Sequence, residues 1–333
     1  MTHKVLIVSG ADEKFGDMQV DCVSSLRRVG YDGDIAILDF GLSAQHRDQL
    51  GRHAAQVRKV DMPDIYQQMI DAGTLVGPPG ANVLLLKPYL PTLFPDHDIF
   101  VFVDADCWFQ TGEAVTGLID CACQADLAAV SQRSRFHPFD GERGGGVEFN
   151  AFGQPLRSNW YTMFANKSRL PRADRRLLAQ VPIINAGVFS AHASSPVWEL
   201  WQAEMLKAAN ALPKRRRYGA DQLGLGMAVY KHGISHLLLP EICNWTNVWR
   251  YDADAGLFTE TMPFYRPVSI MHLAGIRPDE TVRQVTMADG SVTMMDLSYR
   301  SWRSRQEDRQ PAQPMDTGMR RRNPDNGQSR DGT

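Results

Sequence analysis

The sequence lacks three features that would each point to a particular class of protein. It has no Cys-x-x-Cys pair, and its five cysteines are an odd number, which argues against a disulfide framework or a zinc cage and favours reduced, buried thiols. No run approaches the ~20 apolar residues of a membrane span, so no transmembrane segment is expected. The apolar stretch after Lys4 is too short for a signal peptide. We therefore expect a cytoplasmic protein.

The chain also lacks a strong excess of charge of either sign. A formal net charge of −2 and a pI near 6.5 create no general field for nucleic acid, so we expect no nucleic-acid partner. Any anionic ligand must then be held by local groups. The hydrophobic content of 43% in 333 residues is enough for a sizeable core in one large or two ordinary domains.

An apolar run that ends in two acids is the most informative stretch. Residues 99–103, Ile-Phe-Val-Phe-Val, have the composition of a strand buried on both faces, as in parallel sheets. Strand side chains alternate, so Asp104 and Asp106 should project to the same side, about 7 Å apart, and can share one cation. Hard oxygen ligands at the end of a strand suit Mg²⁺ or Mn²⁺ bound to a diphosphate. The alternative is a turn in which both Asp side chains cap backbone amides.

The amino-terminal part reads as a βαβ unit without a dinucleotide-binding fingerprint. Strands are predicted over 4–9 and 35–39, and helices over 17–29 and 43–50, the second beginning at a Ser43 cap. No Gly-x-Gly-x-x-Gly follows the first strand, so no dinucleotide cofactor is indicated. The loop instead offers Asp12 and Phe15, which could hydrogen-bond a base edge and stack on its face. The alternative is an ordinary polar loop with Phe15 in the core.

The remaining chain alternates regular elements with one long irregular segment. Residues 131–166 have little periodicity, which is typical of a lid or a substrate-contacting insertion. We predict helices over 114–123, 196–211 and 221–229, strands over 125–130, 181–189 and 269–275, and a hairpin from 282–287 and 291–297. Residues 300–333 carry eight Arg against five acids, a net charge of +3, and read as a disordered tail. Peripheral contact of this basic tail with anionic lipid is an alternative to full solvation.

Five short motifs, in this order along the chain, resemble the retaining glycosyltransferases of family 8, the group that includes glycogenin and the bacterial lipooligosaccharide galactosyltransferases. The motifs are Phe102-Val-Asp-Ala-Asp106, Ile184-Asn-Ala-Gly-Val-Phe189, Gly219-Ala-Asp-Gln222, Leu239-Pro240 with Asn244, and His272-Leu-Ala-Gly-Ile-Arg-Pro278. The likeness runs from about residue 4 to residue 278. It implies a GT-A fold over 1–299, a single Rossmann-like α/β/α domain with a mostly parallel central sheet. Its nucleotide-binding half would span about 1–130, and its acceptor half 131–299 with the 131–166 insertion.

The resemblance also implies roles for individual residues. A nucleotide sugar, usually UDP-linked, would be bound through Mn²⁺, with Mg²⁺ as the other candidate, and borderline Mn²⁺ accepts one imidazole among oxygen ligands. Asp104, Asp106 and His272 would hold the metal, and Asp221 and Gln222 would lie beside the anomeric carbon. The donor would further contact Asp12 and Phe15 at the base, Lys87 and Ala105 near the Asp pair, Asn185, Ala186 and Gly187 at the sugar, and Gly275 and Arg277 over the diphosphate.

Three positions depart from the family pattern, and they bear on the sugar and the acceptor. Arg277 stands where Lys is usual, Asp279 where Trp is common, and Leu223 where an acid often follows Asp-Gln. The expected activity is transfer of a hexose from UDP-hexose to a hydroxyl of a glycan, glycolipid or protein, with retention of configuration. Two other functions stay open: a sugar nucleotidyltransferase, which would usually carry a Gly-rich basic loop after the first strand, and a non-catalytic sugar-nucleotide or glycan-binding protein of the same fold.

Overall fold

A seven-stranded sheet forms the centre of the computed structural model, which describes residues 3–59, 64, 67, 82–131, 148–149, 155–157, 168–246 and 248–309. The strand order is β10-β6-β9-β4-β1-β2-β3. Strand β9 runs antiparallel to both β4 and β6, and the other pairings are parallel, which confirms the predicted mostly parallel sheet. The strands are β1 (Val5–Ala11), β2 (Asp34–Asp39), β3 (Ala55–Lys59), β4 (Ile99–Val103), β6 (Leu127–Ser131), β9 (Ile184–His192) and β10 (His236–Leu239).

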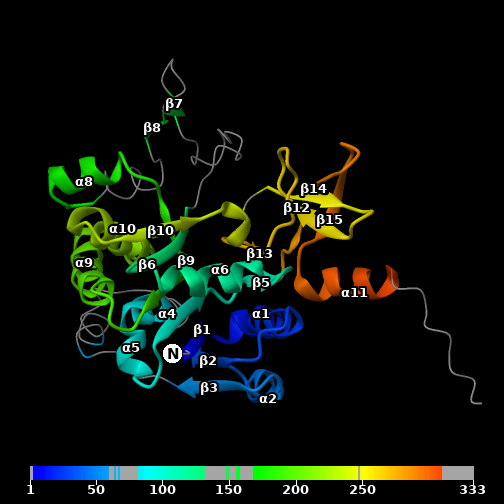
Figure 1. The fold of residues 1–333 in the computed structure, drawn as a ribbon, viewed down its shortest axis with the longest axis horizontal. Coiled ribbons are helices and arrows are strands. Elements are labelled where there is room, and N and C mark those ends of the chain that lie inside the picture. Colours follow the sequence, from blue (N-terminus) through cyan, green and yellow to red (C-terminus); the bar gives the residue numbers. More distant parts are fainter. Residues whose placement is uncertain are drawn as a thin grey trace, which may run out of the picture.

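Helices cover both faces of this sheet and make the molecule a three-layer α/β/α structure (Figure 1). One face packs against α1 (Gly16–Arg28), α2 (Ala44–Arg52) and α6 (Glu113–Ala122). The other face packs against α4 (Asn82–Leu86), α5 (Leu90–Leu93), α8 (Arg172–Leu178), α9 (Val197–Ala211) and α10 (Ala220–His232). Because β4 is buried along its whole length, its continuous apolar run is explained by a core on each side. In the part of the chain that the structure describes, no helix has the length and apolar character needed to cross a membrane.

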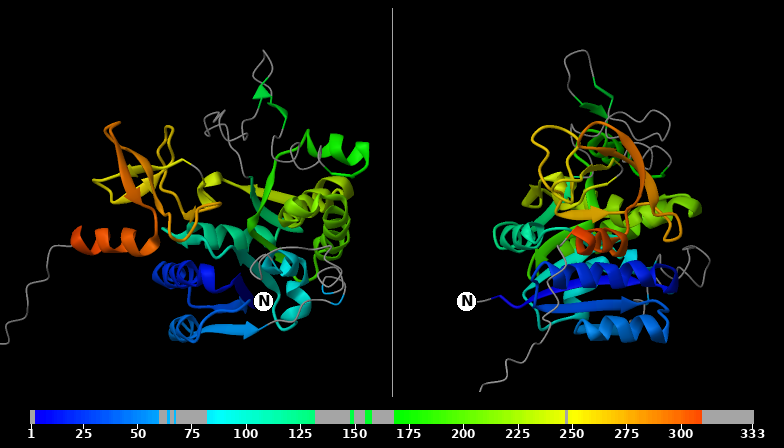
Figure 2. Two further views of the ribbon diagram at one scale, coloured as in Figure 1. Left: turned by 180° about the vertical axis from the view of Figure 1, so that it is seen from behind. Right: turned by 90° about the vertical axis from the view of Figure 1, so that its right-hand side faces the viewer.

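A smaller four-stranded sheet lies at the end of the molecule opposite α8, α9 and α10 (Figure 2). Its order is β12-β11-β14-β15, with β11 (Arg250–Asp252), β12 (Leu257–Thr259), β14 (Val282–Met287) and β15 (Val292–Asp296). The antiparallel pairing of β14 with β15 confirms the predicted hairpin. A third core, which includes Trp108, Tyr251 and Phe258, joins this sheet to the rest of the domain.

Helix α11 (Tyr299–Arg309) shows that the predicted disordered tail was wrong for residues 300–309. Tyr299 and Trp302 are buried in the third core, and Arg300 forms ion pairs with two acids of α1, Asp17 and Asp21. Two aromatic anchors therefore outweigh the polar composition of this segment. The rest of the tail, from residue 310, lies outside the described residues, as does most of the 131–166 segment.

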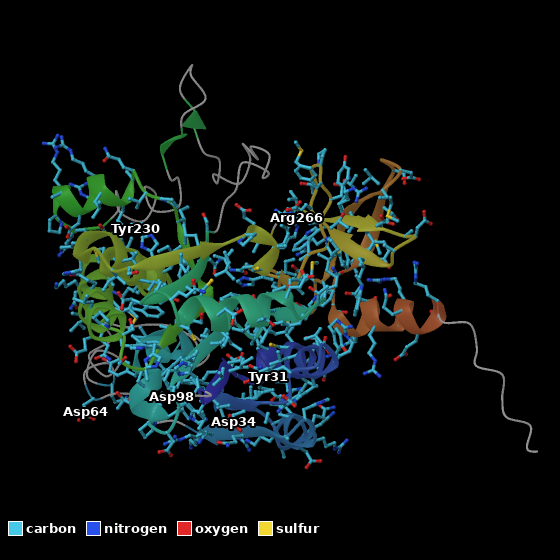
Figure 3. The ribbon with its side chains drawn as sticks, viewed as in Figure 1. Tyr31, Asp34, Asp64, Asp98, Tyr230 and Arg266 are labelled. Atoms are coloured by element: carbon cyan, nitrogen blue, oxygen red, sulfur yellow. The ribbon has the colours of Figure 1, made fainter. Side chains whose placement is uncertain are left out.

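The edge of the large sheet where β1, β4 and β6 end is the part of the fold that matters for function. Because β9 is reversed, its first residues meet these carboxyl ends. Just beyond them, β5 (Cys107–Phe109) pairs antiparallel with β13 (Ile270–His272). Asp34 and Asp98, labelled in Figure 3, mark the opposite edge, at the amino ends of β2 and β4.

The shorter elements are η1 (Glu13–Phe15), η3 (Lys87–Tyr89), η4 (Lys214–Gly219), η5 (Glu241–Cys243), β7 (Glu148–Phe149) and β8 (Pro155–Arg157).

Candidate functional site

The structure brings together the three side chains predicted to hold a metal. His272 Nε2 lies 3.3 Å from Asp106 Oδ1 and 3.9 Å from Asp104 Oδ2. Two backbone hydrogen bonds set this geometry, because Asp104 N donates to Gly187 O at 2.8 Å and Leu273 N donates to Asp106 O at 2.9 Å. The segment after β4 is thus tied both to β9 and to the segment after β13. Two carboxylates and one imidazole converge from residues far apart in the sequence.

The orientation of the His272 ring is fixed by a residue to which sequence reasoning gave no role. Asn244 is buried, and its Oδ1 lies 2.7 Å from His272 Nδ1, so that Nδ1–H donates to the amide oxygen. This leaves the lone pair of Nε2 directed at the carboxylates, as in metal sites where an outer hydrogen bond selects the tautomer of a histidine ligand. Asn244 belongs to one of the family-like motifs, but only the fold reveals its contact with His272.

The carboxylates shift the pKa of the imidazole, and the imidazole shifts theirs. Burial alone would lower the pKa of His272, but the charge of Asp106 and its hydrogen bond with the ring, helped by Asp104, raise it above the usual range. Burial would conversely raise the pKa of Asp106, but the neighbouring imidazolium outweighs burial and holds that pKa below its usual value. In the absence of a metal, therefore, a proton on His272 acts as the local counter-charge to Asp106.

Lys87 connects this cluster to a third carboxylate. Its side chain is 1% exposed, and its Nζ lies 3.0 Å from Asp104 Oδ1 and 3.2 Å from Asp221 Oδ2 while donating to Ala186 O at 2.9 Å. Burial raises the pKa of Asp221, and Lys87 opposes that rise only in part. The pKa of Lys87 is raised because its two carboxylate partners outweigh the burial of the ammonium. A lysine of this kind normally extends to solvent, but here the ammonium is a buried bridge.

The beginning of strand β9 leaves no room for a residue larger than glycine at position 187. A Cβ on Gly187 would lie 2.5 Å from Asp104 Oδ2, 2.7 Å from His272 Cε1 and 2.8 Å from Asn185 Oδ1. Asn185 is buried, and its Oδ1 accepts a hydrogen bond from Gly187 N at 2.6 Å. The predicted Asn-Ala-Gly segment therefore forms one wall of the cluster, with Ala186 contributing its carbonyl group to Lys87.

The loop after β1 carries the predicted base-binding residues at the same edge of the sheet. Asp12 caps η1 by accepting a hydrogen bond from Phe15 N at 3.3 Å, and Phe15 is partly buried between two of the cores. Glu13 anchors this loop to the start of α2, since its Oε2 accepts from Ser43 N at 2.5 Å and lies 3.1 Å from His46 Nδ1. Ser43 caps α2 as the sequence predicted.

The remaining predicted residues are placed less directly. Gln222 is partly buried in the first turn of α10, next to Asp221, and Ala105 lies between Asp104 and Asp106, the two acids predicted to hold a metal. Gly275, at a φ of 73°, forms the turn that follows β13. The structure does not bring Arg277 to the carboxylates, because its side chain is 59% exposed and forms ion pairs with Asp279 and Glu280.

The charge and chemistry of the cluster fit a divalent cation. Three carboxylates, from Asp104, Asp106 and Asp221, face one ammonium, from Lys87, so two negative charges remain when His272 is neutral. Oxygen and imidazole donors suit Mn²⁺, and also Mg²⁺ where water completes the coordination. The side chains of Asp104 and Asp106 are 24% and 16% exposed, so an ion has access to them.

No protein-family model and no curated protein sequence matches the chain. Two glycosyltransferases are among the solved structures that are similar to it. One is the apo structure of WbbM, a bifunctional glycosyltransferase, at a TM-score of 0.51 and 17% identity; the match covers 83% of this chain and 46% of WbbM, so the chain spans less than half of that protein. The other is the galactosyltransferase LgtC in complex with donor and acceptor sugar analogues, at a TM-score of 0.50 and 13% identity, with 94% of this chain and 99% of LgtC covered. At these identities the likeness concerns architecture, and it confirms that the chain has the GT-A fold of these glycosyltransferases.

Proposed function

We propose that the protein is a metal-dependent retaining glycosyltransferase that moves a hexose from a nucleotide sugar, with UDP-hexose as the expected donor, to a hydroxyl of a glycan, glycolipid or protein. The observation that carries this proposal is the convergence of Asp104, Asp106 and His272 at the carboxyl edge of a GT-A sheet. Supporting it, two nearby residues, Asn185 and Asp221, place further buried polar groups beside the same cluster.

In the proposed reaction the bound Mn²⁺ would neutralise charge on the departing diphosphate, which is the main electrostatic task in breaking a glycosyl phosphate bond. Asp104, Asp106 and His272 would hold the ion, and Asn244 would keep His272 in the tautomer that can bind it. Asp12, Phe15 and Ala105 would position the nucleoside. Gly275 and Arg277 would close over the diphosphate, which requires the Arg277 side chain to leave Asp279 and Glu280.

The sugar would lie between the start of β9 and the start of α10. Asn185, Ala186 and Gly187 would bind its hydroxyls, with Gln222 beside the anomeric carbon. Asp221 is the only acid we place there, but its Oδ2 is engaged by Lys87. A carboxylate held in this way is positioned and charge-compensated rather than exposed as a nucleophile, so we favour attack by the acceptor on the face from which the diphosphate leaves.

To test this proposal, a panel of nucleotide sugars is incubated with the protein and Mn²⁺. NMR then follows the release of nucleoside diphosphate and the anomeric configuration of any product. We expect turnover with at least one UDP-hexose, a retained configuration, and loss of turnover in a folded Asp104→Asn variant. Undiminished transfer by Asp104→Asn in the presence of a chelator would refute the metal-dependent mechanism. A thermal shift with UDP-sugars but no turnover would instead indicate a binding protein.

A further inference from the structure

A cysteine lies directly against the proposed metal ligands. The donor atoms of Asp106, Cys107 and His272 all lie within 4.8 Å of one another. Cys107 is 1% exposed and forms no disulfide. The cluster therefore offers a carboxylate oxygen, a thiol sulfur and an imidazole nitrogen around one point, and only the sulfur is new, because Asp106 and His272 also belong to the set described above.

The strand pairing that builds the metal site also places this thiol. Cys107 and His272 are direct partners in the antiparallel β5–β13 ladder, so their Cα atoms are held opposite each other. Asp106, the residue before Cys107, carries the carboxylate that lies 3.3 Å from His272 Nε2. Asp104 does not belong to this group of three, and its Oδ1 lies 3.0 Å from Lys87 Nζ. Asp106 and His272 are thus shared by two overlapping donor sets, one completed by Asp104 and the other by Cys107.

The two donor sets differ in the metals they prefer. Carboxylate oxygens with one imidazole suit Mn²⁺ and Mg²⁺, whereas a thiolate selects thiophilic cations such as Zn²⁺ and Cd²⁺. We propose that Asp106, Cys107 and His272 form a second, thiophilic metal site that takes Zn²⁺ or Cd²⁺ in competition with the cation held by Asp104, Asp106 and His272.

The chemistry of binding balances without any change of oxidation state. The thiol of Cys107 gives up its proton to solvent and its sulfur binds the cation, so that the thiolate and the Asp106 carboxylate together neutralise two positive charges. The Nε2 lone pair of His272 is available because Nδ1–H donates to Asn244. Three protein ligands leave the fourth tetrahedral position for water or an anion. A Zn²⁺ or Cd²⁺ ion at this site would occupy Asp106 and His272, which are two of the three ligands of the proposed catalytic cation, so both ions should inhibit transfer by displacing it; this consequence alone rests on the proposed function.

Direct titration with Cd²⁺ tests the binding. The background carries Cys121→Ser and Cys123→Ser, because these thiols are the less buried ones. We expect one Cd²⁺ per chain and a thiolate-to-cadmium charge-transfer absorption in the ultraviolet. Adding Cys107→Val, of similar volume, should remove that absorption and weaken Cd²⁺ binding by more than about 100-fold, because a direct ligand is lost, whereas loss of a residue that only supports a ligand costs about 10- to 100-fold. Mn²⁺ binding, followed by EPR, should be unchanged.

Two further variants separate this site from the proposed catalytic one. Asp104→Asn should weaken Mn²⁺ binding while leaving the Cd²⁺ absorption intact, and Cys243→Ala, which removes another buried thiol, should change neither. The proposal is overturned if Cys107→Val keeps wild-type Cd²⁺ affinity, or if Cys243→Ala loses the absorption as fully as Cys107→Val does. Because the readout is absorption and EPR rather than turnover, a failure of the glycosyltransferase proposal would leave this result interpretable.

Discussion

Two regions of the molecule bury several charged side chains, but they differ in charge balance. Between α8, α9 and α10, Glu204 Oε1 accepts from Lys207 Nζ at 2.8 Å and lies 2.9 Å from His232 Nε2, while Lys231 Nζ donates to Asp174 Oδ2 at 2.9 Å. Two acids there face two lysines. At the sheet edge, three acids face one lysine.

This difference separates a structural ion cluster from a candidate site. In the helix cluster each acid has a cationic partner within the protein, so the arrangement is complete. At the sheet edge, the charge of Asp106 is offset mainly by a proton on His272, because the more distant Lys87 is paired with Asp104 and Asp221. The side chains of Asp106 and Asp104 both remain partly exposed. A buried excess of negative charge is costly unless a cation offsets it, which makes the imbalance the feature that indicates a ligand.

The largest effect is expected from Asp106→Asn, which removes a metal ligand without changing side-chain size. Transfer should fall by about 1000-fold, or roughly 4 kcal/mol of barrier, because an ion is held less well where charge develops. The matched change in the balanced cluster, Asp174→Asn, should alter the rate less than about twofold. Steady-state rates at one fixed, subsaturating Mn²⁺ concentration measure both. Equal losses in the two variants would mean that charge balance does not distinguish the regions.

Lys87→Met should produce the largest loss of stability. Removing the ammonium takes away the buried cation that Asp104 and Asp221 share, and breaking a buried pair costs about 3 to 5 kcal/mol. In the helix cluster, Lys207→Met should cost less than about 1 kcal/mol, because the Lys207 side chain is 58% exposed. Urea unfolding measures both free energies.

The double variant Lys87→Met/Asp221→Asn tests the cause of this loss. It should recover part of the stability, since one uncompensated acid is removed. No recovery would contradict the view that Lys87 acts by compensating Asp221.

Gly187→Ala should weaken the site while sparing the fold. The added methyl group would displace the Asp104 carboxylate and the His272 ring, which lie 2.5 and 2.7 Å from its position. We expect Mn²⁺ affinity, measured by EPR, to fall about 10- to 100-fold. Gly51→Ala in α2 is the control, because nothing lies within 4 Å of its Cβ position. Unchanged Mn²⁺ affinity in Gly187→Ala would show that Asp104 does not bind the ion in the observed geometry.

The smallest effect concerns the pH dependence of stability in the helix cluster. Burial would raise the pKa of Glu204, but hydrogen bonds from Lys207 and His232 outweigh it and hold the pKa below the usual 4.5. A group with a depressed folded pKa stabilises the protein above its unfolded pKa, and this contribution is lost as pH falls through the folded value. Wild type should therefore lose about 1 kcal/mol more than Glu204→Gln between neutral pH and the region below 4.5. If the unfolding free energies of wild type and Glu204→Gln fall in parallel as the pH is lowered, the assignment of this pH dependence to Glu204 is wrong.

Local pattern was sufficient to predict the central strand, but not the backbone of its two acids. The apolar run of β4 required two covered faces, as observed. The strand alternation expected for Asp104 and Asp106 was wrong, because β4 ends at Val103 and residues 104–106 form a turn, closed by a hydrogen bond from Cys107 N to Asp104 O at 3.1 Å. The helix cap at Ser43 and the β14–β15 hairpin also follow from nearby residues alone. His272 entered through the family-like motif, and the structure places it where that resemblance implies.

The contacts that define the site chemically could not be read from the sequence, because each joins distant segments. Lys87 stands among apolar residues, and only the fold brings Asp221, 134 positions away, to its ammonium. Asn244 and His272 meet because the segment after η5 runs beside β13. The cysteines were expected to be reduced, mostly buried thiols, and only the β5–β13 register pairs Cys107 with His272. The polar composition of residues 300–309 led to a wrong prediction of disorder, because two aromatic side chains anchor α11 in the third core.

The single reversed strand, β9, also determines where this protein can change in evolution. In a purely parallel sheet, the chain leaving one strand must cross to the far edge before the next strand starts. Here β6 ends and β9 begins at the same edge, so the connection between Ser131 and Ile184 departs from and returns to the rim that holds the carboxylates. Insertions and deletions that leave Leu170, Leu178 and Ile183 of this connection in the core need not disturb strand register. Under the proposed function, a lineage could therefore acquire new acceptors by altering this one stretch while the strands that lead to the carboxylates stay as they are.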